Sequence, residues 1–313
     1  MPPLARPVAQ GLFQSAYSDR HQALWVTASV GRPPLVTDSR LLRLDPRTLR
    51  IEAAYPLPVT DAETGAVRAV FGVAVDDEQD TVWTTNTLDD SVSVYRQADG
   101  EHLATLPGVA HAREIVVDAE HGTVWASAFG TGALVAFDSR TYEEKRRVTV
   151  DGAGPTGLDV DRRTGALYAA DFTRSRIIEV TPGAATPRVL PAGDGPLSVA
   201  LSADGRTACT ADQTGGTLTV VDLRTGEATA SVPTGAGAKS ASFDPRTGEF
   251  LVVNRLAGDV TAVDPGTGAV VRTVPTGKFP NHVAIAAGAA YVADKSGSGP
   301  AGEDVLTRIA LDG

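Results

Sequence analysis

The chain has 313 residues, of which 42% are hydrophobic and 21% are charged, a balance typical of a globular protein with a sizeable core. Asp and Glu outnumber Lys and Arg by 38 to 28, and the resulting net charge of −10 argues against duplex nucleic acid or an anionic membrane as the main partner. Cys209 is the single cysteine, which excludes an intrachain disulfide and a thiolate metal cluster.

The first residues, MPPLARPVAQGLFQSAYS, contain no apolar run of the length that a secretory signal needs. No apolar stretch in the sequence reaches the roughly 18 residues that a membrane-spanning helix requires. The sequence therefore predicts a cytoplasmic protein with no membrane partner. A chain from which an export signal had been removed would give the same pattern, so export stays open as the alternative.

A strand-like segment recurs seven times along the chain, and each copy alternates in the period-2 manner of a β-strand, with small residues on one side. The copies occupy residues 14–18, 71–76, 114–118, 157–161, 198–202, 240–244 and 282–286. Their last residues are 58, 42, 43, 41, 42 and 42 positions apart, and regular spacing of this kind is the signature of a repeat architecture. We predict an all-β fold, namely one seven-bladed β-propeller domain of four-stranded antiparallel blades over residues 1–313.

A second strand follows each of these inner strands, and one of its positions usually holds a large apolar side chain. That position is occupied by Trp25, Trp83, Trp125, Tyr168, Cys209, Leu251 and Tyr291. The three tryptophans of the chain therefore share one place in the repeat. An aromatic cage for a ligand is one interpretation. We favour the other, in which these side chains are wedged between neighbouring blades and Cys209 acts as a small buried hydrophobe.

Short motifs such as DPRT, DSRT, DLRTG and DPGTG join the third and fourth strands of several units. Asp accepts backbone N–H groups and Gly supplies positive φ in such turns, so these aspartates are predicted to shape hairpins and not to act as catalytic acids. The last unit ends after its third strand, near residues 305–311. We predict that residues 4–10 supply its missing outer strand, because this closure removes free sheet edges.

Several motifs identify a known type of repeat: the strands TVWTTN, YAAD and YVAD, the turns DLRTGE and DPGTGAV, and the closing PNHVAIAAGAAYVADKS. With them the chain resembles the YVTN-repeat propellers, and more closely the YncE-like group, from about residue 10 to residue 311. The resemblance implies a seven-bladed binding protein of a group whose members are typically exported and are non-enzymatic or of unknown activity, and single-stranded DNA binding is attached to some members. Arg113, Glu114, Arg255 and Asn281 stand where YncE-like proteins carry similar residues.

Loops are predicted to be longer on one face of the propeller than on the other. The connections from each fourth strand to the next first strand, and from each second strand to the third, share one face. Insertions in these connections occupy residues 31–39, 60–68 and 296–303, which belong to the neighbouring blades 7, 1 and 2. Irregular loops on a rigid scaffold commonly carry function, so we predict a working site at this mouth of the central channel, beneath the insertions.

Polar residues at the starts of first strands and the ends of second strands are expected to face this mouth. The predicted ligand-binding residues are Arg68, His111, Arg113, Glu114, Lys239, Arg255, Asn281 and His282. Further residues expected to point there are Asn86, Thr156, Asp171, Asp212, Asn254, Asp294 and Lys295. Because basic groups converge in a cleft that focuses the electric field, the predicted partner is a small anionic ligand or a peptide segment. The alternative is that these groups only solvate the mouth.

Enzymatic activity is the second hypothesis. Glu114, Asn86 and Asn254 could supply oxygen ligands to a hard cation in a metal-assisted lactonase or hydrolase, and a propeller lyase is a further alternative. The five histidines fit no zinc motif, and two G-x-G-x-x-G segments at residues 152–157 and 297–302 are interpreted as loops. We favour a binding monomer without metal or cofactor. Duplex nucleic acid is not an expected ligand, whereas single-stranded DNA stays open through the resemblance.

Overall fold

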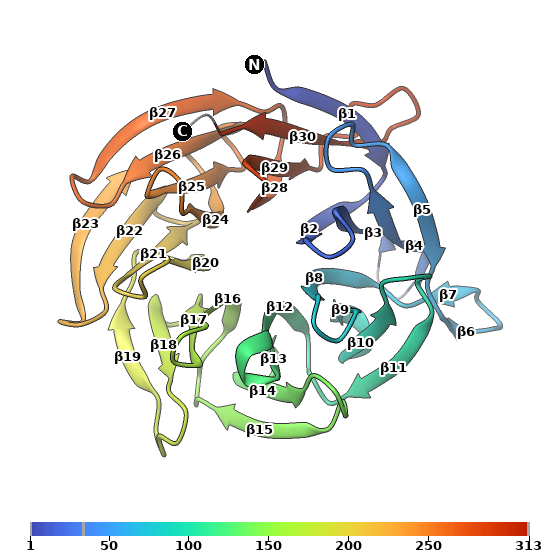
Figure 1. Ribbon diagram of the computed structural model, residues 1–313, viewed down its shortest axis with the longest axis horizontal. Helices are drawn as coiled ribbons and strands as arrows, with labels where there is room; N and C mark the ends of the chain where they lie inside the picture. Colours follow the sequence, from blue (N-terminus) through green and yellow to red (C-terminus); the bar gives the residue numbers. More distant parts are fainter. Residues whose placement is uncertain (1, 33–34, 312–313) are drawn as a thin grey trace.

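The computed structural model describes residues 2–32 and 35–311, and it contains seven four-stranded antiparallel sheets arranged around a central axis (Figure 1). The predicted seven-bladed β-propeller is thereby confirmed. We number the blades in chain order and letter their strands A to D from the axis outward. Strand B is buried along its whole length in most blades, whereas strand D alternates between exposed and partly buried residues, as expected of sheets that are solvated only at the outer edge.

The strands of blades 1 to 4 are β2 (Leu12–Ser18), β3 (Ala23–Arg32), β4 (Leu35–Leu44) and β5 (Ile51–Pro56); β8 (Val70–Asp76), β9 (Thr81–Asn86), β10 (Ser91–Arg96) and β11 (His102–Pro107); β12 (Ala112–Asp118), β13 (Thr123–Ala128), β14 (Ala133–Asp138) and β15 (Glu144–Thr149); and β16 (Pro155–Asp161), β17 (Ala166–Asp171), β18 (Arg176–Val180) and β19 (Arg188–Pro191).

Blades 5 to 7 consist of β20 (Pro196–Leu201), β21 (Thr207–Asp212), β22 (Thr217–Asp222) and β23 (Glu227–Pro233); β24 (Ala238–Asp244), β25 (Glu249–Asn254), β26 (Asp259–Asp264) and β27 (Ala269–Pro275); and β28 (Pro280–Ala286), β29 (Ala289–Asp294), β30 (Asp304–Ala310) and β1 (Leu4–Ala9). A small hairpin of β6 (Val59–Asp61) and β7 (Ala66–Val67) precedes blade 2, and two 3-10 turns, η1 (Thr87–Asp89) and η2 (Ala119–His121), lie within blades 2 and 3. No helix in the described ranges is long and apolar enough to cross a membrane.

The two ends of the chain meet in blade 7. Strand β1 pairs antiparallel with β30, with Leu4 opposite Arg308 and Ala9 opposite Asp304. This confirms the predicted closure by the N-terminal strand. Gly11 and Leu12 strengthen it, because their backbone N–H groups donate to one carboxylate oxygen of Asp304 at 2.8 and 3.0 Å. The ring is therefore held shut by a ladder and by hydrogen bonds from the first residues of blade 1.

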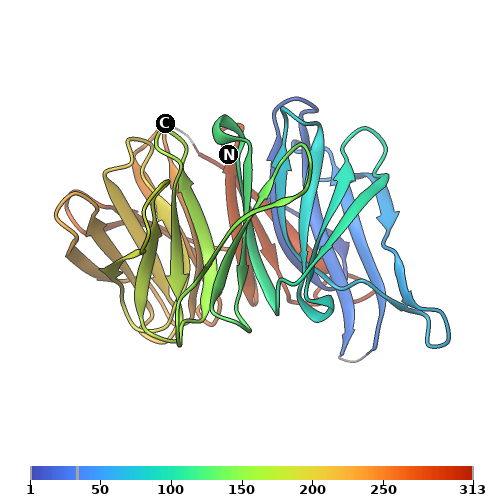
Figure 2. The same ribbon diagram turned by 90° about the horizontal axis from the view of Figure 1, so that it is seen from below.

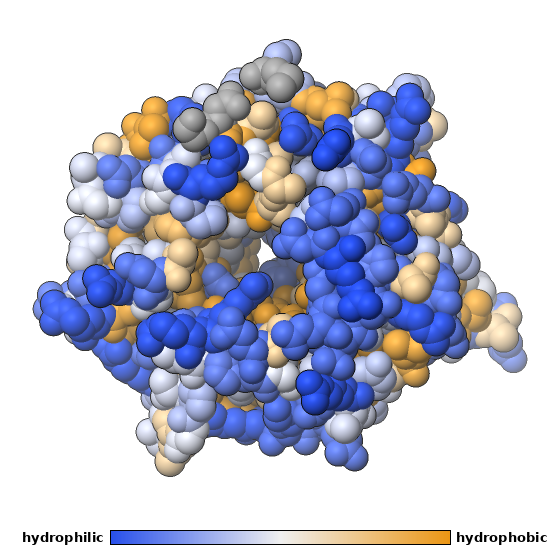
Figure 3. Space-filling model, viewed as in Figure 1, coloured by the Kyte–Doolittle hydropathy of each residue, from blue (hydrophilic) through white to orange (hydrophobic). Residues whose placement is uncertain are grey.

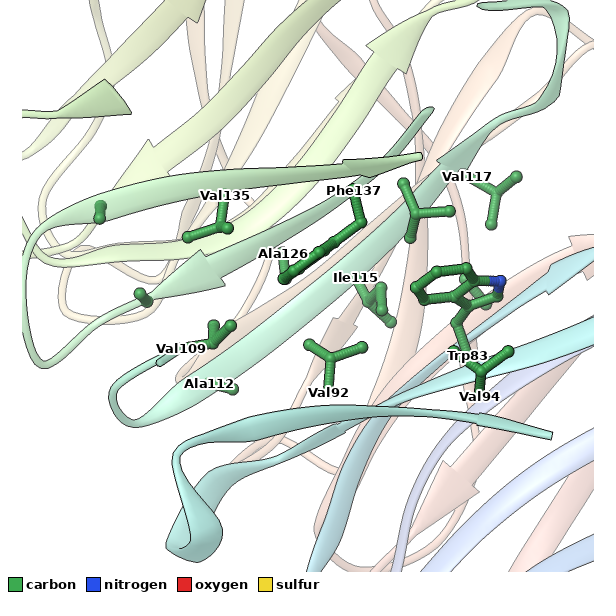
Figure 4. Close-up of a cluster of buried hydrophobic side chains, with 14 residues drawn as sticks. Trp83, Val92, Val94, Val109, Ala112, Ile115, Val117, Ala126, Val135 and Phe137 are labelled. Carbon is green, nitrogen blue, oxygen red and sulfur yellow. The ribbon is translucent and has the colours of Figure 1, made fainter. Parts of the chain in front are cut away.

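The shared position of the tryptophans lies between blades. Trp25 and Trp83 are completely buried and Trp125 is 5% exposed, which confirms the predicted burial. Trp83 of blade 2 packs against Ile115, Val117 and Phe137 of blade 3 (Figure 4). Each tryptophan thus fills the wedge that opens between two sheets as they diverge from the axis, where only a large side chain reaches both.

Every inner strand shifts its register against strand B near its first residues, as between Ala112 and Ile115 of β12. A β-bulge bends the strand and re-aims the side chains beside it. The bulge occurs in all seven A strands and therefore sets which residues face the axis at the D–A end of the channel.

The D–A and B–C loops share one face and the A–B and C–D turns share the other (Figure 2). The predicted insertion at residues 60–68 differs from expectation in where it points. The β6–β7 hairpin contacts β4 and projects outward from the ring, away from the axis (Figure 1). A D–A connection leaves from the outermost strand of a blade. An insertion near the start of this connection therefore extends the outer edge of the propeller and does not cover the channel. Residues 33 and 34 of the insertion at 31–39 lie outside the described residues.

Candidate functional site

The A strands enclose two chambers that meet in one layer of side chains. The residues at that repeat position are Gln14, Gly72, Glu114, Gly157, Ser198, Ser240 and His282. Toward the D–A loops the layer borders a narrow chamber with a cavity volume of about 30 Å³. Toward the A–B turns it borders a wider chamber of about 620 Å³, which opens at the centre of the face shown in Figure 3. Glu114 and His282 line both chambers and lie at the boundary between them.

Glu114 is held by the side chain of Gln14, which reaches it from two blades away, past a glycine in the intervening blade. The amide of Gln14 in blade 1 donates from Nε2 to Oε2 of Glu114 in blade 3 at 2.9 Å. Oε1 of Gln14 accepts from the backbone N–H of Val73 at 3.3 Å. Gly72 of the intervening blade permits this reach, because a Cβ there would lie 2.8 Å from the carbonyl oxygen of Arg113 and 3.3 Å from Oε1 of Gln14.

The close approach at Gly72 gives a stability prediction. Replacing Gly72 by alanine should lower the free energy of unfolding by about 1–3 kcal/mol, because overpacking forces the neighbouring backbone to move. Urea denaturation measures the change. Gly266→Ala is the matched control, since a Cβ there meets only the carboxylate of Asp264 in an outer turn, at 3.3 Å. Equal stability of the two variants would contradict the packing described at residue 72.

Four basic side chains gather around the narrow chamber. Arg113 and Lys239 line it, and Arg255 and Lys295 stand above it at the ends of strands B of blades 6 and 7. Lys239 senses the other three: burial lowers the pKa of its ammonium to about 8, and the charges of Arg113, Arg255 and Lys295 act in the same direction. Burial likewise lowers the pKa of Lys295 to about 8. The four groups therefore form one positive region.

Aromatic rings and an amide, in place of carboxylates, support three of these cations. The guanidinium of Arg113 lies 4.9 Å from the centre of the Phe71 ring, and Nζ of Lys295 lies 3.5 Å from that of Phe13. Arg255 donates to Oδ1 of Asn281 at 2.7 Å. Within the described part of the chain, none of the four basic groups forms an ion pair with a carboxylate within 4.0 Å. Their charge is thus left available to the solvent side of the mouth.

Burial favours the neutral forms of the two acid–base groups of the boundary layer, Glu114 and His282. Burial raises the pKa of the Glu114 carboxyl to about 7, against the opposing hydrogen bond from Gln14. Burial also lowers the pKa of His282 to about 4, assisted by the charge of Lys239. The Nδ1 of His282 accepts from the backbone N–H of Ser15 at 3.3 Å, which agrees with a neutral ring. The narrow chamber therefore carries a net positive charge.

The structure brings six of the eight predicted site residues together and separates two. Arg113, Glu114, Lys239, Asn281 and His282 line the narrow chamber, and Arg255 joins them through Asn281. Arg68 instead donates to Oγ of Ser91 at 3.4 Å, at the start of strand C of blade 2, because the D–A connection that carries it begins far from the axis. His111 stays at the rim, where its ring lies 5.6 Å from that of Phe129.

The acids and amides expected at the mouth have a different role. Asn86 donates to Oγ of Ser91 and Ser93, and one oxygen of Asp212 accepts from Thr217 and Thr219. Asp171, Asn254 and Asp294 likewise bind groups of their own B–C region, and Asp171 also accepts from the backbone N–H of Gly154. These side chains fold back into the blade, so Asn86 and Asn254 do not join Glu114 as cation ligands. No group of three His, Cys, Asp or Glu residues in the described ranges could hold a metal ion.

Sequence reasoning left out Gln14, Phe13 and Phe71, which complete the chamber. Their positions carried a signal. Gln14 occupies the repeat position of Glu114 and His282, and the two phenylalanines occupy that of Arg113 and Lys239. Placing all seven units in register at the start of strand A, and reading each column as one layer of the channel, would have found them.

Comparison with known proteins finds relatives of moderate sequence similarity. No family model matches it. An uncharacterized protein named YncE from Salmonella typhimurium is 28% identical over 300 residues, covering 91% of this chain and 82% of that protein. The chain is thus similar in sequence to the YncE proteins and folds as a seven-bladed β-propeller. An uncharacterized YncE from Escherichia coli K12 is 27% identical over 245 residues, which cover 73% of the YncE-like chain and 67% of the relative.

A solved structure shows the same fold at low sequence similarity. The hydrazine synthase of Kuenenia stuttgartiensis superimposes on the YncE-like propeller with a TM-score of 0.78 at 16% identity, covering 97% of each chain. At this identity the likeness concerns the path of the backbone alone. The curated relatives are named as uncharacterized, so a role for the YncE-like propeller has to be argued from its own channel.

Proposed function

We propose that this protein is a binding module that holds a small anionic ligand at the D–A mouth of its channel, with the acid group in the narrow chamber beside Arg113 and Lys239. The observation that carries the proposal is the gathering of four basic groups that rest on aromatic rings and an amide, in a chain whose net charge is −10. Positive charge held in a cleft walled by protein focuses the field outward and attracts anions.

The side chains that line the narrow chamber suit an oxyanion as the ligand. Arg113 offers a planar fork that matches a carboxylate or phosphate, and Lys239 adds a point charge. Glu114 contributes an O–H donor when it is protonated, and its pKa of about 7 keeps that form populated at neutral pH. A cavity of about 30 Å³ accommodates one acid group in place of about two water molecules. The remainder of the ligand then lies over the mouth.

Isothermal titration with inorganic phosphate and with citrate tests the proposal. We expect one binding site per chain, weakened by salt because surface charges are screened. Chloride at the same ionic strength serves as the control for nonspecific screening. If neither anion bound, or if both bound with a stoichiometry that varied with salt, the chamber would not be an anion site.

The pH dependence of binding follows from two groups. Glu114 gains a negative charge as the pH rises through about 7, and Lys239 loses its positive charge as the pH rises through about 8. Both changes oppose an anion, so affinity should be highest below about pH 7 and fall steadily toward about pH 9. The dissociation constant of citrate, whose own carboxyl groups are ionised over most of this interval, measures it. Lys239→Arg should remove the upper part of the fall and Glu114→Gln the lower part, whereas a flat profile would contradict the assignment.

A further inference from the structure

The residue four positions after the shared tryptophan position occupies an equivalent place in every blade and forms a rim around the mouth; it follows strand B in six blades and lies within the longer β3 in blade 1. These residues are Ser29, Thr87, Phe129, Phe172, Gln213, Arg255 and Lys295. Five of them are fixed through the backbone: the N–H of Lys295 donates to the carbonyl of Phe279 at 3.0 Å, and that of Phe172 donates to Gly154 at 3.0 Å, with equivalent bonds in blades 1, 5 and 6. Backbone anchoring on a rigid ring gives the rim side chains defined positions.

The rim side chains lean over the following blade, and they divide into two halves. Phe129 covers Gly154, because a Cβ added to Gly154 would lie 2.8 Å from the Phe129 ring. Phe172 covers Gly195 in the same way, and a Cβ added to Gly195 would lie 3.2 Å from the Phe172 ring. Arg255 reaches Asn281, and Lys295 reaches the ring of Phe13. Blades 3 and 4 therefore present aromatic rings to the rim, whereas blades 6 and 7 present cations.

Backbone strain marks both halves. Two positions before the repeat position of Arg113 and Lys239, the backbone has positive φ at Gly11, Gly195 and Gly237, a conformation that glycine adopts freely. His111 and Phe279 occupy the same place with φ of 49° and 57°, a conformation that costs an L-residue free energy. Strained residues with large side chains concentrate at ligand sites. The His111 ring extends the aromatic half beside Phe129, and the Phe279 ring lies 5.6 Å from the guanidinium of Arg255.

The narrow chamber is too small for the body of an organic ligand. A cavity of about 150 Å³ is needed for a benzene ring, and the chamber has about 30 Å³. An acid group can enter beside Arg113 and Lys239, but whatever it is attached to stays at the level of the rim. The rim therefore selects among acids by the group that each one carries.

We propose that the ligand is an aromatic acid, whose carboxylate or phosphate enters the narrow chamber while its ring lies against Phe129 and Phe172. This inference rests on the proposed function, because it assigns the body of the ligand whose acid group the chamber holds. The cations Arg255 and Lys295 on the other half draw the acid in and set its orientation. Aromatic rings prefer offset or edge-on contact with one another, which the two rim phenylalanines and His111 offer.

Calorimetric titration with three matched phosphates tests the assignment: inorganic phosphate, cyclohexyl phosphate and phenyl phosphate. We expect phenyl phosphate to bind about tenfold more tightly than inorganic phosphate, with cyclohexyl phosphate between them. Phe129→Leu and Phe172→Leu keep apolar bulk over the glycines and should each reduce the phenyl preference to about threefold while leaving the affinity for inorganic phosphate unchanged. Leu256→Ala is the control, since this exposed side chain lies on the same face in blade 6.

The outcomes separate the two proposals. Tight binding of inorganic phosphate with no gain for phenyl phosphate, or a gain that survives both leucine variants, would overturn the aromatic assignment and leave the anion site standing. Equal binding of cyclohexyl and phenyl phosphates would also overturn it, because a generic apolar contact would then suffice. Absence of binding for all three phosphates would remove the anion site and the aromatic assignment together.

Discussion

Replacing Arg113 by alanine should weaken the binding of citrate or phosphate at least tenfold while leaving the unfolding temperature nearly unchanged. Arg113 lines the narrow chamber, rests on Phe71 and forms no ion pair with a carboxylate in residues 2–32 and 35–311, so its guanidinium is available to a bound oxyanion. Truncating one charged contact that is shielded from water typically costs about 2–5 kcal/mol of binding free energy. Arg255→Ala should act in the same direction with a smaller effect, because Arg255 stands above the chamber.

The matched control is Arg68→Ala. It removes the same charge from the same chain, but Arg68 donates to Ser91 at the start of an outer strand and lies outside the chamber. Calorimetric titration of all three variants measures the dissociation constants, and thermal unfolding shows that each variant is folded. An affinity that survives Arg113→Ala, or that falls equally in Arg68→Ala, would show that the bound anion responds to overall charge and not to this chamber.

Replacing Trp83 by alanine should lower the free energy of unfolding by about 3–5 kcal/mol, as for other large-to-small changes in a core. Trp83 is completely buried and joins blade 2 to Ile115, Val117 and Phe137 of blade 3, so the change opens a cavity between the two sheets. Urea denaturation followed by circular dichroism measures the loss. Trp83→Phe should recover a large part of it, because a phenyl ring still spans the wedge.

Loss of less than about 1 kcal/mol in Trp83→Ala would mean that the blades pack against each other without this wedge. Acrylamide quenching offers an independent check on the intact protein. Trp25, Trp83 and Trp125 are all buried, so their fluorescence should resist the quencher until the protein unfolds. Efficient quenching in the native state would contradict the packing of the shared position.

The blades could be predicted from sequence because each unit repeats the same physical pattern. Seven alternating segments at nearly constant spacing fix the number of sheets, and the missing strand after residue 311 fixes the closure by residues 4–10. The tryptophans shared one column, and burial between blades explained that column without a ligand. These features depend on periodicity and composition, which single residues do not alter.

The site was harder to predict from the sequence, because neighbouring polar residues at the end of a strand point in opposite directions. Asn254 folds into its own blade, whereas Arg255 beside it reaches over blade 7. The two residues stand at the end of the same strand, and the direction of the Asn254 side chain is set by partners such as Thr261 that only the folded sheet brings near. The bond between Gln14 and Glu114 depends on the glycine of the blade between them. Such contacts depend on residues of three blades, so the sequence of any single repeat unit does not predict them.

The pairing of β1 with β30 also sets the last blade apart from the other six. Each of those six blades consists of four strands that are consecutive in the chain, so its strand pairings are local. Blade 7 instead joins Leu4–Ala9 to Asp304–Ala310, so this pairing closes a loop that contains the other six blades. Long-range strand pairings form slowly, because loop closure costs conformational entropy before the contact stabilises anything. We therefore expect the pairing of β1 with β30 to be the last to form when the ring closes.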